Sequence, residues 1–364
     1  MRPQRYKLST QKRSLDYPLL LAVAFLIIFG LIMVYNSSVI QAIKDFDDSD
    51  YYIRQQIVWV VIGILSAIFF TFFDYNKFKK LSLPMLLVSI VLLLLVLVPG
   101  LGVTAGGAHR WLNLGFATIQ PAEIIKLTGV LYLATVFEKK ARILPIILLT
   151  GLIIFIMAVL QRDLGSTIVY VITSATVYFI AGGSILQFVI IIPVTFLAFA
   201  YLALSSEYRR KRILAFLDPF SDPQGFTYHI SQVLIALGSG GLFGLGLGQS
   251  RQKFEYIPEV STDSIFAIIG EELGFIGGLL LIISFAFFAV RGFRIAERSN
   301  DSFGRILASG LTSWIVIQAI VNLSSMVALM PLTGVPLPFI SYGGSALVMN
   351  LTAVGILLNI SKNN

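Results

Sequence analysis

Long apolar runs dominate this sequence and constrain its fold more than any other feature. Runs near the ~20 residues that cross a bilayer recur from Pro18 to the C-terminus, so hydropathy rather than core periodicity organises the chain. Charged residues make up 13% of the chain, whereas soluble domains are nearer about a quarter charged. That is too few charges to cover a water-facing surface. The sequence therefore predicts an all-α polytopic membrane protein, with residues 1–364 in a single membrane domain.

The apolar segments predict about ten transmembrane helices. An even number places both termini on one side, and the short loops on that side carry most of the basic residues, which is the pattern of cytoplasmic loops. We therefore expect the N-terminus and the C-terminus to be cytoplasmic, with residues 1–16 as a tail and 205–263 as a long external loop. The predicted spans are 17–38, 55–73, 82–99, 121–137, 143–160, 165–182, 184–204, 264–290, 303–329 and 342–360.

Composition also excludes several classes of function. The chain has no cysteine, which excludes disulfides and thiol-ligated metal sites. The net charge of +8 comes from Lys and Arg placed mostly at helix ends, where membrane lipid headgroups are the expected counter-charge. Because no long basic stretch is interleaved with aromatic residues, nucleic acid is not an expected partner.

The first polar region surrounds the start of the fourth predicted span. Pro121 suits the first turn of a helix, and Glu123 and Lys126 then project from one helical face. Ionisable groups within a span are costly and usually mark a functional site, although a purely structural ion pair is the alternative. Arg110, on the preceding external loop, is either part of that site or an interfacial anchor next to Trp111.

The long external loop supplies the second polar region. Its cations Arg209, Arg210 and Arg212 either contact lipid phosphates or capture a pyrophosphate, which arginine grips bidentately. The glycine-rich run 231–248 that follows is apolar but too short to span, so it predicts a re-entrant or interfacial element.

Carboxylates at the start of the eighth predicted span form the third region. Asp263 is either an N-cap or a catalytic group, and Ser261 or Thr262 would cap equally well. Glu271 and Glu272 lie about two turns deeper, where adjacent carboxylates cannot both face lipid. We expect these two to form hydrogen bonds inside the bundle as structural groups.

These polar stretches resemble the motifs of the FtsW/RodA/SpoVE family, the shape, elongation, division and sporulation proteins. The matching stretches are Gln120-Pro-Ala-Glu-Ile-Ile-Lys126, Gln161-Arg-Asp-Leu-Gly165, Tyr256 to Gly274, and Leu337-Pro-Phe-Ile-Ser-Tyr-Gly-Gly344. They occur in the family's order, and the resemblance covers nearly the whole chain. Arg162 departs from the pattern, since the family usually has proline there. Ala215-Phe-Leu-Asp-Pro219 and 269–274 look more like the division or sporulation branch than the elongation branch.

The resemblance implies a peptidoglycan glycosyltransferase in the bacterial cytoplasmic membrane. Such an enzyme polymerises lipid II, the undecaprenyl-pyrophosphate-linked precursor, into glycan strands on the external face during division or cell-shape growth. It implies Asp263 as the essential carboxylate, with Glu123 and Lys126 in the same cavity and Arg110 and Arg54 nearby. A carboxylate at a helix end suits a general base, and the cations suit a pyrophosphate leaving group.

A divalent cation, Mg2+ or Mn2+, is expected with the pyrophosphate, and no organic cofactor is expected. The sequence leaves open whether Asp263 is a base or a metal ligand.

Two other functions fit a bundle with buried charges. One is a transporter that flips lipid II, which would place its polar groups near the midplane rather than toward one face. The other is a scaffold without catalytic activity, which leaves Asp263 unexplained.

Partner proteins are also expected, because no external stretch is long enough to hold a cross-linking domain. The family implies a class B penicillin-binding protein, a transpeptidase, together with other division or elongation proteins. The small residues Ala308, Ser309, Gly310 and Ser313 either dock that partner or pack against neighbouring spans.

Overall fold

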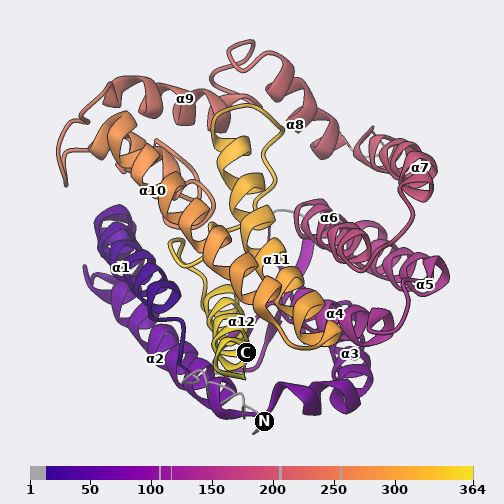
Figure 1. Cartoon of the computed structure of the whole chain (residues 1–364). Coiled ribbons are helices and arrows are strands. Elements are labelled where there is room, and N and C mark those ends of the chain that lie inside the picture. Colours follow the sequence, from indigo (N-terminus) through magenta and orange to yellow (C-terminus); the bar gives the residue numbers. More distant parts are fainter. Residues whose placement is uncertain (1–13, 106–107, 116, 205–206, 255, 364) are drawn as a thin grey trace, which may run out of the picture.

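The protein is a helical bundle, described by a computed structural model for residues 14–105, 108–115, 117–204, 207–254 and 256–363 (Figure 1). Each predicted span corresponds to a helix. The helices at those positions are α1 (Tyr17–Phe46), α2 (Tyr51–Phe72), α3 (Phe78–Leu95), α4 (Pro121–Phe137), α5 (Ile143–Ile154) with the π-helical turn Phe155–Leu160, α6 (Leu164–Ile180), α7 (Ile185–Leu204), α10 (Ile265–Arg298), α11 (Ser302–Met326) and α12 (Gly344–Asn363).

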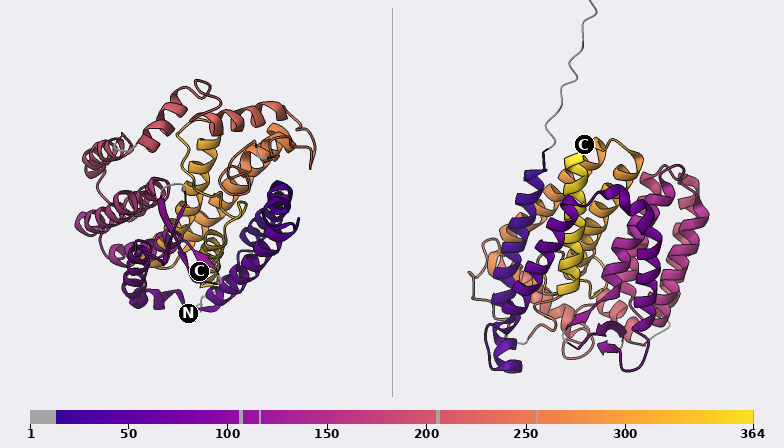
Figure 2. Two further views of the ribbon diagram at one scale, coloured as in Figure 1. Left: turned by 180° about the vertical axis from the view of Figure 1, so that it is seen from behind. Right: turned by 90° about the horizontal axis from the view of Figure 1, so that it is seen from below.

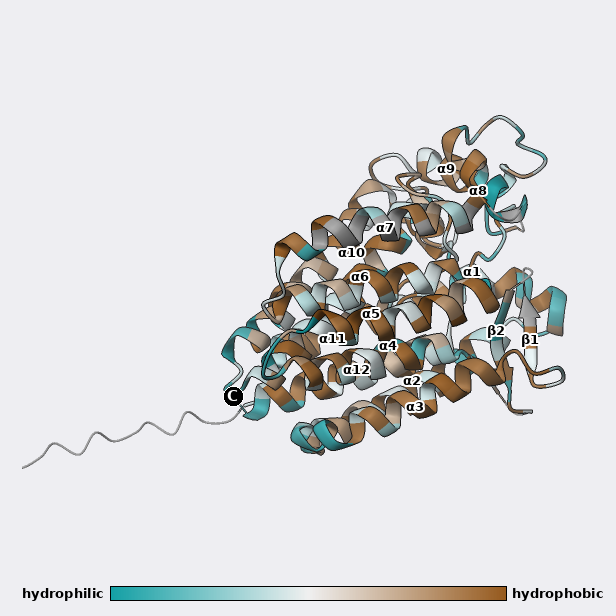
Figure 3. Cartoon of the chain, turned by 90° about the vertical axis from the view of Figure 1, so that its right-hand side faces the viewer, coloured by the Kyte–Doolittle hydropathy of each residue, from teal (hydrophilic) through white to brown (hydrophobic). Residues whose placement is uncertain are grey.

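Length and composition make this a multi-pass membrane protein. Seven helices in the part of the chain that the structure describes are long and apolar enough to cross a membrane. The helices α4 and α6 are shorter, with 17 residues each. Hydrophobic residues predominate along the middle of the helices, and hydrophilic residues are more frequent at the two ends of the bundle (Figure 3).

The buried centre of the bundle is formed by α11 and α12. Trp314 and Leu311 of α11 and Leu357 of α12 are fully buried. The helices α1 and α2 lie on one side of this centre, with α2 packed along α12, and α3 to α6 lie on the other (Figure 1). Since the two central helices already have protein neighbours, their polar residues can face the interior of the protein rather than lipid.

One end of the bundle carries structure that the sequence did not predict. A three-stranded antiparallel sheet is formed by β1 (Gly102–Ala105), β2 (Ala108–Asn113) and β3 (Thr118–Ile119), in that order. The segment expected as a long external loop contains α8 (Glu207–Leu217), and α9 (Tyr228–Gly240) overlaps the re-entrant or interfacial element expected at 231–248. Figure 2 shows the sheet at one end of the bundle and the C-terminus at the other. The three strands and α8 were missed because they are too short to give a hydropathy signal.

The glycine-rich run after α9 lies against a break in α10. The break is at Gly274, whose φ of 66° is left-handed. Across it, the amides of Leu245 and Gly246 donate to the carbonyls of Glu271 and Glu272, both at 3.0 Å. A Cβ at Gly244 would lie 2.1 Å from the Glu272 carbonyl oxygen. The glycines therefore allow two backbones to pack directly against each other, which side chains would prevent.

Glu271 and Glu272 are structural groups, as expected. Glu271 accepts hydrogen bonds from the Ser250 hydroxyl and from the Arg251 amide. Glu272 accepts from the Ser250 amide at 3.1 Å and lies 3.7 Å from the ammonium of Lys253. The two carboxylates thus hold the loop after α9 against α10.

The small residues of the ninth predicted span do not form an exposed patch. Ala308, Ser309, Gly310 and Ser313 are all buried in α11. A Cβ at Gly310 would lie 2.7 Å from Val130 of α4 and 2.9 Å from Val177 of α6. The docking alternative is therefore wrong for these residues. Their small size permits close packing within the bundle.

Candidate functional site

Asp263 lies just before α10 and does not cap it. The N-cap position is Ser264, and no side chain caps the helix there. The Asp263 backbone is held instead by Asn322 of α11, whose amide nitrogen donates to the Asp263 carbonyl at 2.8 Å and to the Val335 carbonyl at 2.8 Å. The N-cap alternative is therefore wrong. Asp263 is 8% exposed, and its carboxylate accepts a 3.4 Å hydrogen bond from the neighbouring Thr262 hydroxyl, so it is available for a role other than capping α10.

Three charged groups from distant parts of the sequence converge at Gly334. Its φ of +68° is left-handed, and a Cβ built there would lie 3.6 Å from an oxygen of Asp263. The same position is 3.6 Å from a guanidinium nitrogen of Arg110 and 3.9 Å from one of Arg212. Glycine leaves a small open space between one carboxylate and two guanidinium groups, which a side chain would fill.

The strand β2 and the start of α6 hold Arg110 in place. The Arg110 guanidinium lies 3.5 Å from the carboxylate of Asp163, which is buried and caps α6 by accepting from the Ser166 amide at 3.3 Å. The neighbouring Arg162 has a φ of 62°. Proline cannot adopt that angle, so this loop has a backbone that the family's usual proline would not permit.

A buried ion pair is joined to the same central loop through α11. The Lys126 ammonium lies 2.7 Å from the Glu123 carboxylate, and neither side chain is exposed. Lys126 also donates to the Gln318 side-chain oxygen at 2.6 Å, and Gln318 donates to the Pro336 carbonyl at 3.1 Å. Pro336 is two residues from Gly334. The pair is therefore connected to the Asp263 site by a short chain of hydrogen bonds.

Several buried polar atoms around this loop have no hydrogen-bond partner among the described residues. They are one carboxylate oxygen each of Glu123 and Asp163, the side-chain oxygen of Asn322 and the hydroxyl of Thr333. Because buried polar groups in folded proteins are nearly always satisfied, such a concentration indicates that water or a polar ligand enters here. The unpaired atoms favour a binding site over a closed structural core.

The environment of Asp263 suits a group that exchanges a proton near neutral pH. Burial, and secondly the negative charge of Glu259, raise the pKa of Asp263 from 3.8 to about 6. The positive charge of Arg212 acts in the opposite direction. Such a carboxylate is charged at pH 7 yet basic enough to accept a proton.

The basic cluster of α8 divides into an inward and an outward part. Arg212 faces the site and donates to the Leu332 carbonyl at 2.9 Å. Arg209 is partly buried, and burial together with the charge of Arg162 lowers its pKa. Arg210 is exposed, and Lys211 forms an exposed ion pair with Glu207. Only part of the predicted capture surface therefore lies at the site.

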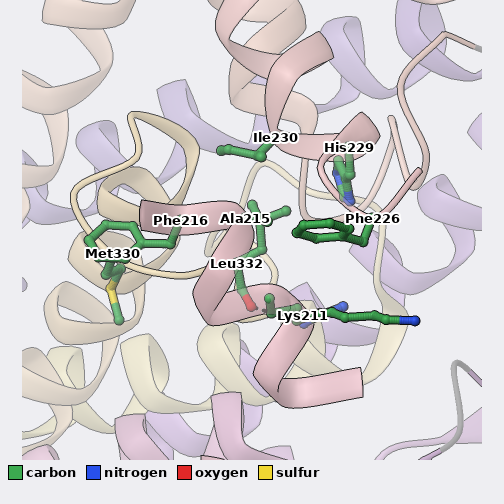
Figure 4. Close-up of a pocket in the computed structure, with 9 residues that line it drawn as sticks. Lys211, Ala215, Phe216, Phe226, His229, Ile230, Met330 and Leu332 are labelled. Carbon is green, nitrogen blue, oxygen red and sulfur yellow. Dashed lines mark hydrogen bonds between the residues drawn. The ribbon is translucent and has the colours of Figure 1, made fainter. Parts of the chain in front are cut away.

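A cavity of about 250 Å³ adjoins Arg212, between α8 and α9. Figure 4 shows Phe216 and Met330 on one side of it and Phe226 and His229 on the other. Burial lowers the pKa of His229 to about 4, so its imidazole is neutral at pH 7, and it shares a 2.7 Å hydrogen bond with Ser264. This places a largely apolar cavity with a cationic edge beside Asp263.

Arg54 is positioned differently from the other predicted residues. It lies in the first turn of α2, is 62% exposed and forms an ion pair with Asp48. His109 and Trp111 belong to β2, on either side of Arg110. The structure thus brings together Asp263, Arg110 and Arg212, connects Glu123 and Lys126 to them, and leaves Arg54 in a separate surface pair.

The described residues contain no group of three or more His, Asp or Glu side chains that would hold a metal ion by themselves. Mg2+ commonly uses only one or two carboxylates and takes its other ligands from substrate phosphates and water. Asp263 could be the single carboxylate in a site of that kind.

Sequence reasoning missed Gln318, Asn322, Asp163 and Gly334 as parts of the site. Gln318 and Asn322 gave one usable signal, since two amides four residues apart on an apolar span lie on one face and need buried partners. Gly334 gave none, because its role depends on which side chains surround it.

The fold and site define a multi-pass membrane protein with a polar, largely buried centre near one end of its helices. The FtsW/RodA/SpoVE family model, described as cell cycle protein, matches residues 17–364. The chain belongs to this family.

Similar proteins support this family assignment. Stage V sporulation protein E of Bacillus subtilis is 41% identical over 362 residues, covering 98% of this chain and 99% of the relative. The probable peptidoglycan glycosyltransferase FtsW of Trichlorobacter lovleyi is 40% identical, covering 95% and 93%.

Solved structures have the same fold. A chain from a peptidoglycan synthase complex that coordinates polymerization and crosslinking matches with a TM-score of 0.78 and 28% identity, covering 96% of this chain and 98% of that one. RodA, the rod shape determining protein of Thermus thermophilus, matches with a TM-score of 0.71 and 27% identity, covering 96% and 97%.

Proposed function

We propose that this protein polymerises lipid II into glycan strands on the external face of the bacterial cytoplasmic membrane. The chain is a cell-wall glycosyltransferase, as its family and its relatives named peptidoglycan glycosyltransferase indicate. The observation that carries the proposal is the convergence of one carboxylate, Asp263, and the guanidinium groups of Arg110 and Arg212 around Gly334.

The chemistry of glycosyl transfer fits this arrangement. A sugar hydroxyl of one substrate attacks the anomeric carbon of another, forming a carbon–oxygen bond as the bond to the pyrophosphate breaks. Asp263 takes the hydroxyl proton as general base, which its raised pKa favours. Arg110 and Arg212 stabilise the negative charge that develops on the leaving pyrophosphate. A single displacement of this kind inverts the anomeric carbon and needs no second carboxylate as nucleophile.

A divalent cation, Mg2+ or Mn2+, is part of the proposal. If Asp263 held the ion together with the substrate pyrophosphate, it would act as a metal ligand instead of as the base, and the ion would neutralise charge on the leaving group. In that case the two guanidinium groups bind the remaining phosphate oxygens.

The proposed topology places about ten spans in the membrane with both termini in the cytoplasm. The sheet, α8, α9 and Asp263 are then external, where lipid II is polymerised. The glycine-rich run 231–248, which begins within α9, would lie at that surface as a re-entrant or interfacial element. The cross-linking partner is a class B penicillin-binding protein in a separate chain, which the likeness to a chain of a peptidoglycan synthase complex supports.

Flipping of lipid II is the second candidate function. The buried pair Glu123–Lys126 favours it, because buried charges within a bundle also occur in transporters. The catalytic proposal explains more, since the convergence at Gly334 supplies both a base and a leaving-group site.

Purified protein supplied with lipid II tests these alternatives. The polymerase produces glycan strands in detergent, where no membrane exists to cross, and a flippase or a scaffold produces none. Strand length is measured by gel electrophoresis after lipid removal. A parallel reaction in the presence of a chelator tests whether strand synthesis requires a divalent cation. Full activity in the chelator would exclude that requirement. Absence of strands from folded protein would contradict the polymerase.

The pH dependence of strand synthesis follows from the pKa of Asp263. Asp263 acts as a base only when deprotonated, so activity falls about tenfold per pH unit below pH ~6. Because the charge of Glu259 raises this pKa, Glu259→Gln should shift the acidic limb to lower pH. The pH profiles of the two proteins, measured side by side, check this. Superimposable acidic limbs would show that Asp263 is not the titrating group.

A further inference from the structure

A polar cavity is lined by residues at the start of α1 and the end of α12. Figure 2 shows the C-terminus at the end of the bundle opposite the sheet. The cavity measures about 720 Å³. Its walls come from three helices that are far apart in the sequence. Asp16 and Tyr17 lie at the start of α1, Arg291, Arg294 and Arg298 at the end of α10, and Ser361 at the end of α12. We refer to this cavity as the terminal pocket.

The charges in the terminal pocket are unbalanced. Asp16 accepts two hydrogen bonds from Arg291, at 3.1 and 2.6 Å, and a third from the Leu19 amide at 2.9 Å. This carboxylate is therefore committed to Arg291 and to the cap of α1. Arg294 and Arg298 are exposed, and the described residues include no ion pair for either. Two arginines one helical turn apart thus face the same opening, and neither forms an ion pair with another described residue.

The surface beside the terminal pocket marks the level of lipid headgroups. Tyr17 is 62% exposed, and one turn further into α1 Leu21 is 67% exposed. On α10, Phe287 and Val290 are 46% and 48% exposed, just before the arginines begin. Exposed tyrosine at the boundary between an apolar band and cations is typical of the membrane interface. A ligand in the pocket would therefore have apolar protein surface directly beneath it.

We propose that the terminal pocket binds the phosphate headgroup of an anionic phospholipid. Arg294 and Arg298 grip the phosphate oxygens, which guanidinium groups do bidentately. The acyl chains lie along the exposed apolar side chains of α1 and α10. A free phosphate ion would use the same arginines, but it would leave most of the cavity and its apolar flank unused. Basic pockets between membrane helices bind phospholipid headgroups by this chemistry.

Lipid retention by the purified protein tests the proposal. The full-length protein is exchanged into detergent with phosphatidylglycerol, or with phosphatidylcholine of the same chains, and bound lipid is counted by native mass spectrometry. Wild type should retain phosphatidylglycerol selectively. Arg294→Gln with Arg298→Gln should weaken that binding roughly 30-fold, about 5.5-fold for each cation removed. Both side chains are exposed, so the variant should fold, which its melting temperature verifies.

Arg305→Gln is the matched control, because Arg305 is exposed at the same end of the bundle but does not line the pocket. It should retain phosphatidylglycerol like wild type. Equal losses in the control and the double variant would show general surface attraction and overturn the proposal, as would undiminished binding by the double variant. Displacement of the lipid by inorganic phosphate would assign the pocket to a soluble anion and also overturn it.

Discussion

Asp263→Asn should abolish strand synthesis while the protein still inserts and folds. Asparagine keeps the shape of the side chain but cannot accept the proton of the attacking hydroxyl, so the rate should fall by about 10²–10⁴-fold. The Asn322 hydrogen bonds that hold this segment go to backbone carbonyls, and the substitution leaves them in place. The measurements are the polymerisation rate with lipid II and the melting temperature in detergent.

Asp47→Asn is a suitable control for this experiment. Asp47 is an exposed aspartate in a left-handed conformation, which asparagine tolerates, and it lies in the loop between α1 and α2. Its activity should match wild type. Strand synthesis by Asp263→Asn at a rate close to that of the control would contradict the assignment of Asp263 as base.

Breaking the buried pair Glu123–Lys126 should have the second large effect. With both side chains fully buried, Lys126→Met leaves an uncompensated carboxylate and Glu123→Gln leaves an uncompensated ammonium. Either single substitution should destabilise the protein by about 3–5 kcal/mol, because a buried charge loses its partner. The double substitution removes both charges and should recover most of that stability. Melting temperatures of the four proteins give the coupling between the two sites.

Activity of the double variant separates the two interpretations of this pair. If the pair only stabilises the start of α4, the double variant should recover strand synthesis together with stability. If the pair belongs to the site, activity should stay low even though the double variant is stable. The reason is that the ammonium that holds Gln318, and through Gln318 the Pro336 carbonyl, is missing. We expect the second result.

The exposed pair Glu207–Lys211 provides the comparison. Its side chains are 69% and 51% exposed, so solvent screens the interaction. Removing either partner should change stability little, and the double-mutant cycle should be additive. If the stability changes of the two single substitutions at Glu123 and Lys126 also added up to that of the double variant, the buried pair would not be coupled.

The loop between α11 and α12 is the structural centre of the site. Gly165 at the start of α6 packs on it so closely that a Cβ there would lie 2.3 Å from the Thr333 carbonyl oxygen. Asn322 and Gln318 hold its Val335 and Pro336 carbonyls from α11. Side chains from β2, α8 and the start of α10 then meet at Gly334. A substitution that shifts any one of these elements should therefore also shift the loop next to Asp263.

The membrane architecture of this protein is readable from its sequence because hydrophobic length is a local property. Each predicted span coincides with a helix, and the structural roles of Glu271 and Glu272 follow from the cost of placing carboxylates in lipid. The Glu123–Lys126 pair was also predictable, since residues three apart on a helix lie on one face. Family motifs then singled out Asp263.

The tertiary structure alone decided how those residues combine. Arg110, Arg212, Asp263 and Gly334 come from four separate stretches, and no spacing along the chain says that they meet. Burial likewise decided that Gly310 packs inside the bundle and that Arg54 pairs on the surface. A helix needs only its own residues to satisfy its backbone, whereas a site requires distant side chains to share one desolvated space. Packing of the whole chain creates that space.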